Sequence, residues 1–109
     1  MAYLLIIIFL NSNSYGENNR YFEFDKGIVA LMYHRFDEHK YPSTNIQMDI
    51  FKEQINIIEN LKINFLHPKN LNEEISKPNK VKKILLTIDD GFQSFYDNAW
   101  PILKKENIP

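Results

Sequence analysis

Apolar and polar positions alternate in blocks along the chain, and each block has roughly the length of one helix or strand. The continuous apolar run at 27–34 and the apolar run at 81–86 are typical of strands buried in a parallel sheet, and 63–66 is a short strand candidate. Apolar residues recur every three to four positions over 48–62, which predicts an amphipathic helix with one buried face. The segment 92–105 predicts a second long helix. Strands and helices therefore alternate along the sequence.

The segments between these blocks carry turn residues. A charged loop is predicted over 35–45, with Pro42 inside it, and a surface turn over 76–80. Residues 71–75 predict one or two helical turns. Pro101 falls within the last helix and should kink it or mark a restart, because proline cannot donate a backbone hydrogen bond. The order of elements predicts an α/β fold with parallel strands.

The N-terminal apolar run differs from the others. Residues 3–10 are apolar, and the small polar stretch 11–16 follows them. The run is too short for a stable membrane span, and its flanks resemble the cleavage region of a secretory signal, with cleavage after Ser14 or Gly16. No Lys or Arg precedes the run, and a buried first strand is the alternative. We predict a signal peptide over 1–16, and hence export to the periplasm, the extracellular space or the cell surface.

Composition and charge narrow the choice of function. The 109 residues are 44% hydrophobic and 25% charged, which suits one domain with a modest core. The formal net charge of −1 argues against a basic nucleic-acid surface, so no nucleic-acid partner is expected. The chain has no cysteine, which excludes disulfides, thiolate metal sites and a cysteine nucleophile.

Two adjacent carboxylates, Asp89 and Asp90, follow the last predicted strand and precede the last predicted helix. In α/β barrels, catalytic groups collect at this end of the strands. One carboxylate could bind a divalent cation while the other removes a proton from water. Gly91 allows the backbone a positive φ. Taken alone, these residues leave open both metal-assisted hydrolysis and a helix-entry turn with solvated acids.

Residues 84–109 resemble the first motif of the polysaccharide deacetylases, the NodB-homology group or carbohydrate esterase family four. That motif reads Thr-Phe-Asp-Asp-Gly, then a helix with a Pro-x-Leu segment, then Ile-Pro. Here Ile88 replaces the usual Phe, and the remaining positions match. Upstream, residues 31–36 and 51–55 are similar to the N-terminal portion of the branch that acts on exported poly-N-acetylglucosamine.

The resemblance implies a fold, a domain organisation and a function. The fold would be the N-terminal portion of a distorted (β/α) barrel, incomplete here because a full barrel needs roughly 200 residues or more. After the signal peptide, 17–83 would be an N-terminal strand and helix region, and 84–109 the start of a truncated deacetylase domain. The function would be metal-dependent removal of N-acetyl groups from an amino-sugar polysaccharide, the expected partner.

The resemblance also implies roles for particular residues. Asp89 would be the general base and Asp90 a ligand of a divalent metal, usually zinc. The other ligands would be two His in a His-x-x-x-His motif, and a later His would protonate the leaving amine. The chain has three His, and none forms that motif, so we expect an incomplete metal site and an inactive fragment. His34 follows a buried strand and could line the substrate cleft or be structural.

Two other classes of function stay open. One is a non-enzymatic remnant that binds carbohydrate or a partner, which the missing His pair favours. The other is an unrelated acidic-loop metal hydrolase, such as a magnesium phosphatase. That class should show further acidic residues at strand ends and phosphate-binding Gly or Lys, and the sequence has no evident example.

Overall fold

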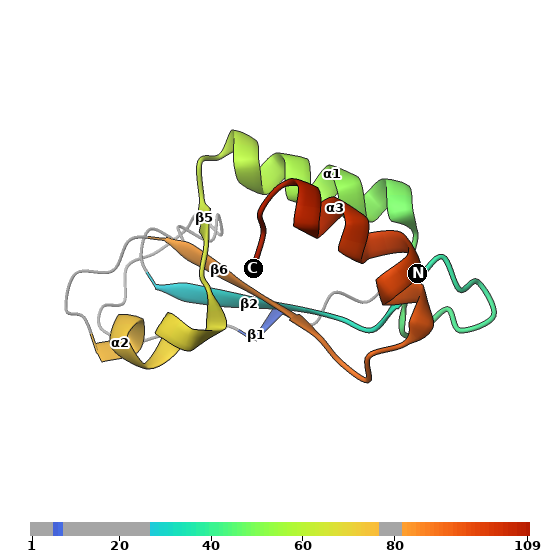
Figure 1. The fold of residues 1–109 in the computed structure, drawn as a ribbon, viewed down its shortest axis with the longest axis horizontal. Helices are drawn as coiled ribbons and strands as arrows, with labels where there is room; N and C mark the ends of the chain where they lie inside the picture. Colours follow the sequence, from blue (N-terminus) through green and yellow to red (C-terminus); the bar gives the residue numbers. More distant parts are fainter. Residues whose placement is uncertain (1–5, 8–26, 77–81) are drawn as a thin grey trace, which may run out of the picture.

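The computed structural model describes residues 6–7, 27–76 and 82–109, which form a sheet with helices packed on it (Figure 1). Its strands are β1 (Ile6–Ile7), β2 (Ile28–Tyr33), β3 (Arg35–Phe36), β4 (Asn45–Ile46), β5 (Asn64–Phe65) and β6 (Lys83–Ile88). Its helical elements are α1 (Met48–Asn60), the short 3₁₀ turn η1 (Pro68–Asn70), α2 (Leu71–Ser76), the π-helical turn η2 (Phe95–Ala99) and α3 (Trp100–Lys105).

The main sheet has four strands in the order β1-β2-β6-β5. β2 and β6 are parallel over their full length, with Ile28 opposite Lys83 and Tyr33 opposite Ile88. β5 is also parallel to β6, whereas β1 is antiparallel to β2. The predicted α/β fold with parallel strands is therefore confirmed. Closure into a barrel stays a prediction.

β1 lies within the segment predicted to be a signal peptide. Ile6 pairs with Leu31 and Ile7 with Ala30. This pairing agrees with the alternative of a first strand, but it does not test cleavage, so the signal peptide stays a prediction. The rest of 1–16 and the N-terminal part of the 17–83 region lie outside the described residues, as does most of the turn predicted over 76–80.

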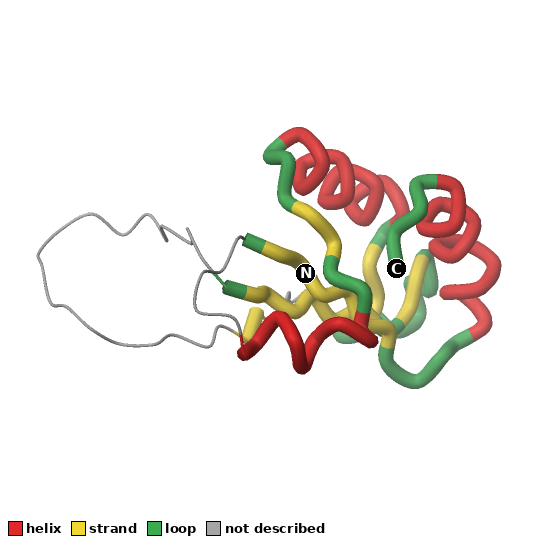
Figure 2. The backbone as a smooth tube through the Cα atoms, turned by 60° about the vertical axis from the view of Figure 1, so that its left-hand side comes forward, coloured by secondary structure: helices red, strands yellow, loops and turns green. Residues whose placement is uncertain are grey.

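The core lies between one face of the sheet and the helices α1 and α3, which Figure 1 and Figure 2 show on the same side of the sheet. Burial alternates along β2 and along the first part of β6, as expected for strands with one face turned to the core. Phe36 and Phe51 have no exposed surface, and their rings meet edge to face with centroids 5.1 Å apart. These two rings join β3 to α1.

Within the segment predicted as a loop, 35–45, the structure places a small second sheet. β3 and β4 are parallel, and the N–H of Arg35 donates to the carbonyl of Thr44 at 3.1 Å. Strands of two residues carry no hydrophobic period, so the sequence pattern could not reveal them. The turn has a further role: Asp37 Oδ1 accepts the N–H of Met48 at 2.8 Å and so caps the start of α1.

Element ends differ slightly from the predictions. α1 ends at Asn60 rather than at 62, and Lys62 has a left-handed φ of 56° that an α-helix cannot accommodate. β6 runs later than predicted, to Ile88, so Asp89 follows it immediately. The predicted restart at Pro101 is confirmed, because a π-helical turn precedes it and α3 begins at Trp100. Among the described residues, no helix combines the length and apolarity needed to cross a bilayer.

Candidate functional site at the carboxyl ends of β2 and β6

His34 and Asp89 lie next to each other at the carboxyl ends of two paired parallel strands. Each follows the last residue of its strand, and the N–H of Asp89 donates to the carbonyl of Tyr33 at 2.8 Å. The Nε2 atom of His34 is 3.9 Å from Oδ2 of Asp89. Their side chains are 26% and 46% exposed, so both are open to solvent and to a ligand. The structure thus brings an imidazole and a carboxylate together at the edge where the sequence predicted chemistry.

Asp90 occupies a tight turn. Its φ is 64°, and the N–H of Gly91 donates to the carbonyl of Asp89 at 2.8 Å, across a single residue. A three-residue turn with positive φ is the rare and strained kind of γ-turn. Gly91 also has a positive φ, of 58°. Gly91 thus adopts the positive φ that glycine allows, and Asp90 has a positive φ as well.

The described residues do not supply a complete metal site. They contain no group of three His, Asp or Glu side chains placed to hold an ion, whereas a zinc site uses at least three protein ligands. His39 is exposed on the loop after β3. His67 Nδ1 accepts the N–H of Lys69 at 3.3 Å and caps η1. The zinc site with Asp90 as a ligand therefore stays a prediction. The described side chains alone do not complete it.

An arginine that the sequence analysis did not single out lies beside this turn. The Cζ atom of Arg35 is 3.3 Å from the ring centroid of Phe92 and 4.0 Å from that of Tyr41. Cation–π contacts of this kind are attractive, and more so where the cation is partly desolvated. The Arg35 side chain is only 17% exposed. Phe92 follows Gly91 directly, so Arg35 contacts the carboxyl side of the turn.

Glu38 and Ser94 extend the same cluster. Arg35 Nη1 donates to Glu38 Oε2 at 2.7 Å, and Ser94 Oγ donates to Glu38 Oε1 at 2.6 Å. Ser94 is buried, and its Oγ also accepts the N–H of Phe36 at 3.2 Å. The hydrogen bond from Ser94 lowers the pKa of the Glu38 carboxyl most, and Arg35 lowers it further, whereas partial desolvation opposes them. Glu38 is thereby held as an acceptor for both neighbours.

Only part of this cluster had a signal in the sequence. Arg35 and Glu38 are three residues apart, a spacing at which opposite charges can pair. Their contacts with Phe92 and Ser94 join segments far apart in the chain, and no local pattern predicts such contacts. The sequence analysis therefore found the carboxylates and the histidine but missed the groups around them.

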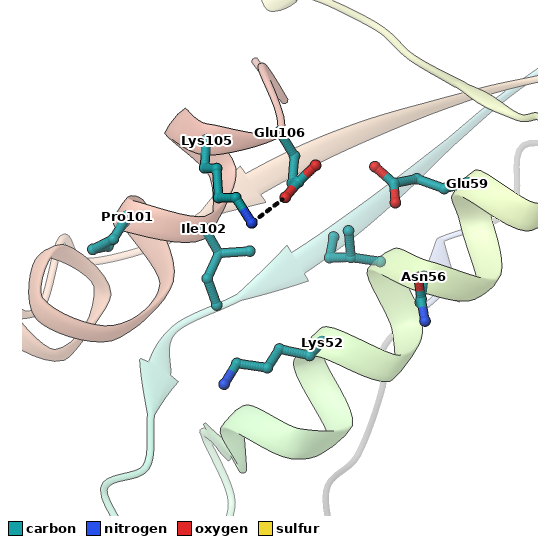
Figure 3. Close-up of a pocket in the computed structure, with 8 residues that line it drawn as sticks. Lys52, Asn56, Glu59, Pro101, Ile102, Lys105 and Glu106 are labelled. Carbon is teal, nitrogen blue, oxygen red and sulfur yellow. Dashed lines mark ion pairs between the residues drawn. The ribbon is translucent and has the colours of Figure 1, made fainter.

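An open groove of about 480 Å³ lies between α1 and α3 (Figure 3). Lys52, Asn56 and Glu59 face it from α1, and Pro101 and Ile102 from α3. None of the predicted site residues lines it. At its rim, Lys105 Nζ lies 3.4 Å from Glu106 Oε1. The groove is thus separate from the edge that carries His34 and Asp89.

No family model and no curated relative matches the chain. Among solved structures, it is similar to IcaB from Ammonifex degensii, with 30% sequence identity and a TM-score of 0.69. The match covers 77% of this chain and 36% of IcaB, so the chain spans about a third of that structure's length. The similarity to IcaB extends beyond the fold to the sequence.

Proposed function

We propose that this chain carries part of the active site of a polysaccharide deacetylase, which removes N-acetyl groups from an amino-sugar polymer. The observation that carries the proposal is the 3.9 Å approach of His34 Nε2 to Asp89 Oδ2 at the carboxyl ends of adjacent parallel strands. The similarity to IcaB supports the same function. The Asp-Asp-Gly segment, with its resemblance to the first deacetylase motif, lies at the same edge.

The two neighbouring side chains divide the proton transfers of amide hydrolysis. Asp89 accepts a proton from the water that attacks the N-acetyl carbonyl carbon. As the carbon–nitrogen bond breaks, His34 donates a proton to the sugar nitrogen, so acetate leaves and a free amine remains on the sugar. His34 is the donor proposed within this chain because it lies beside Asp89, and the later His implied by the resemblance stays a prediction. General acid–base catalysis of this kind contributes about 10²- to 10⁴-fold in rate.

Metal dependence is part of the proposal. A divalent cation, zinc by family resemblance, would polarise the N-acetyl carbonyl and lower the pKa of water. Asp90 is the residue at the family's ligand position, and the described residues bring no group of three ligands together. A complete site therefore requires donors other than those described, and we expect the 109-residue chain by itself to release no acetate.

The proposed substrate determines on which side of the membrane the enzyme must act. An exported amino-sugar polymer lies outside the cytoplasm, so a deacetylase acting on it must be exported too, in agreement with the short apolar run at 3–10. The parallel pair β2–β6 would then be the first part of a distorted (β/α) barrel. The match to 36% of IcaB is consistent with a barrel of which these residues form one portion.

A chimera tests the proposed function directly. Residues 27–109 of this chain replace the structurally matched segment of IcaB, and acetate release from an N-acetylglucosamine oligomer is followed by proton NMR. We expect release that a chelator abolishes, that added zinc restores, and that Asp89→Asn abolishes. IcaB itself is the positive control. A folded, zinc-loaded chimera without activity, or one that Asp89→Asn leaves unchanged, would sink the proposal.

A second function has one observation in its favour. The described residues lack a three-ligand metal group, which suits a remnant that binds sugar without hydrolysing it. The same chimera separates the two functions, because a remnant would bind the oligomer without releasing acetate. In that case Asp89→Asn would leave binding of the oligomer unchanged, and neither the chimera nor its variant would release acetate.

A further inference from the structure

The turn at Asp89-Asp90-Gly91 is unfavourable when considered by itself. Asp90 has a φ of 64° and Gly91 a φ of 58°, so two successive residues are left-handed. For an L-residue this conformation costs free energy, because Cβ comes too close to the following carbonyl oxygen. Such residues persist only where the surrounding structure over-determines them. The contacts on either side of the turn must therefore hold it.

On the amino side, the sheet provides the restraint. The N–H of Asp89 donates to the carbonyl of Tyr33 at 2.8 Å, which extends the β2–β6 ladder by one step beyond the strands. Two residues earlier, Thr87 Oγ1 donates to the carbonyl of Leu31 at 3.4 Å. The backbone is thus fixed up to Asp89.

On the carboxyl side, the restraint comes from side chains. The Phe92 ring lies against the guanidinium of Arg35, with the Cζ atom 3.3 Å from the ring centroid. Ser94 Oγ is bonded to both Glu38 and the backbone of Phe36. The chain is therefore fixed again from Phe92 onward, and only Asp90 and Gly91 lie between the two sets of contacts.

Arg35 joins these carboxyl-side contacts to one another. Its guanidinium lies against Phe92 and also donates from Nη1 to Glu38 Oε2 at 2.7 Å, while Glu38 Oε1 accepts from Ser94. A planar guanidinium can stack on a ring and donate in its own plane at once, which the ammonium of lysine cannot do. Tyr41 lies 4.0 Å from the Cζ atom and adds a second aromatic contact.

We propose that Arg35 is a positioning residue that holds the strained Asp89-Asp90-Gly91 turn, by stacking on Phe92 while it pairs with the Glu38 carboxylate that binds Ser94. Its importance for catalysis rests on the proposed deacetylase function, since the turn carries the proposed base and the proposed metal ligand. Arg35 itself touches neither carboxylate in this arrangement. It acts on them through Phe92 and the backbone of Gly91.

The experiment compares ¹⁵N-labelled variants of the 109-residue chain by NMR, with no substrate or metal. Arg35→Lys keeps the charge and removes the planar fork, and Phe92→Leu removes the ring. The readouts are the amide chemical shifts and the heteronuclear NOE values at Asp90 and Gly91. We expect both variants to shift these amides and to lower their NOE values. We also expect the double variant to differ little from either single one, because both remove the same contact.

Two controls separate positioning from general stability. Lys104→Gln changes an exposed cation on α3, and Ile55→Val removes a methyl group from the core. We expect Ile55→Val to lower the melting temperature and to leave the Asp90 and Gly91 signals unchanged. The proposal fails if Arg35→Lys and Phe92→Leu both leave those signals as in the wild type. It also fails if Ile55→Val disturbs the turn as much as they do at a matched loss of melting temperature.

These measurements require no catalysis, so their outcome is independent of the test of function. An inactive IcaB chimera would remove the deacetylase proposal and leave the role of Arg35 in the turn standing. If Arg35→Lys and Phe92→Leu both gave the same Asp90 and Gly91 signals as the wild type, the role of Arg35 would be ruled out. The deacetylase proposal would still stand.

Discussion

His34 and Asp89 are far apart in the sequence, yet Nε2 of the first lies 3.9 Å from Oδ2 of the second. The parallel register of β2 and β6 produces this approach, because Tyr33 is opposite Ile88 and each site residue comes next in its strand. A one-residue slip would turn every side chain of a strand to the other face, so a buried core face protects this register. The buried residues of both strands therefore also set the geometry of the site.

Removing the imidazole of His34 should reduce catalysis without unfolding the protein. In the IcaB chimera, we expect His34→Gln to lower kcat by about 10²- to 10⁴-fold, the usual contribution of a general acid or base. The matched control is His39→Gln, because His39 is exposed and is not paired with either Asp. Acetate release and the melting temperature should be measured together. Equal activity of the two variants would rule out His34 as the proton donor.

Substitution of Gly91 tests the backbone strain of the turn. A Cβ added at Gly91 would meet no atom within 4 Å, so the cost of Gly91→Ala comes from its φ of 58° alone. We expect a loss of about 1–2 kcal/mol in the free energy of unfolding, the usual cost of a left-handed L-residue. Urea denaturation measures it. Asp90→Gly is the matched comparison and should be neutral or stabilising, and a destabilising Asp90→Gly would contradict the assignment of strain to this turn.

Glu38 should make stability depend on pH in the acidic range. Because the folded pKa of Glu38 lies below its ordinary value of 4.5, the carboxylate stabilises the fold above that value. This contribution should be lost as pH falls below 4.5 through the folded pKa. We expect the urea midpoint of the wild type to drop more steeply than that of Glu38→Gln between about pH 6 and pH 3. This range brackets the usual pKa of glutamate. Parallel curves would contradict the Glu38–Ser94–Arg35 contacts.

Tyr33 should make stability depend on pH in the alkaline range. Burial raises the pKa of its phenol from 10.0 to about 12, because ionisation in the core is unfavourable. The unfolded chain therefore loses this proton first, and stability should fall as pH rises from about 10 to about 12. Tyr33→Phe should remove this part of the alkaline loss, although it also removes the 2.7 Å hydrogen bond to Gln54. Absorbance of the phenolate during titration gives the pKa directly, and an ordinary value would contradict the burial of Tyr33.

The core also explains which element predictions were accurate. β2 and α1 each bury one face, and their apolar residues form a continuous run in β2 and recur with the period of a helix in α1. The sequence pattern therefore predicted both elements. β3 and β4 have two residues each and depend on the backbone hydrogen bonds between them, for which the sequence has no local signal. At Pro101 the sequence predicted a kink or a restart but not the π-helical turn before it, because proline removes a donor without specifying how the chain adjusts.

The sequence by itself determined the α/β alternation, the Asp-Asp-Gly segment at one strand end, and His34 as a candidate residue at the end of another strand. These properties follow from local hydrophobic period and from residue order. Only the tertiary structure decided that His34 meets Asp89, since that contact depends on the register of two strands distant in the chain. The same holds for Arg35, whose contacts with Phe92 and Glu38 arise where separate segments pack together. A pattern along the chain can indicate which face of an element is buried, but it contains no information on which distant side chain that burial brings close.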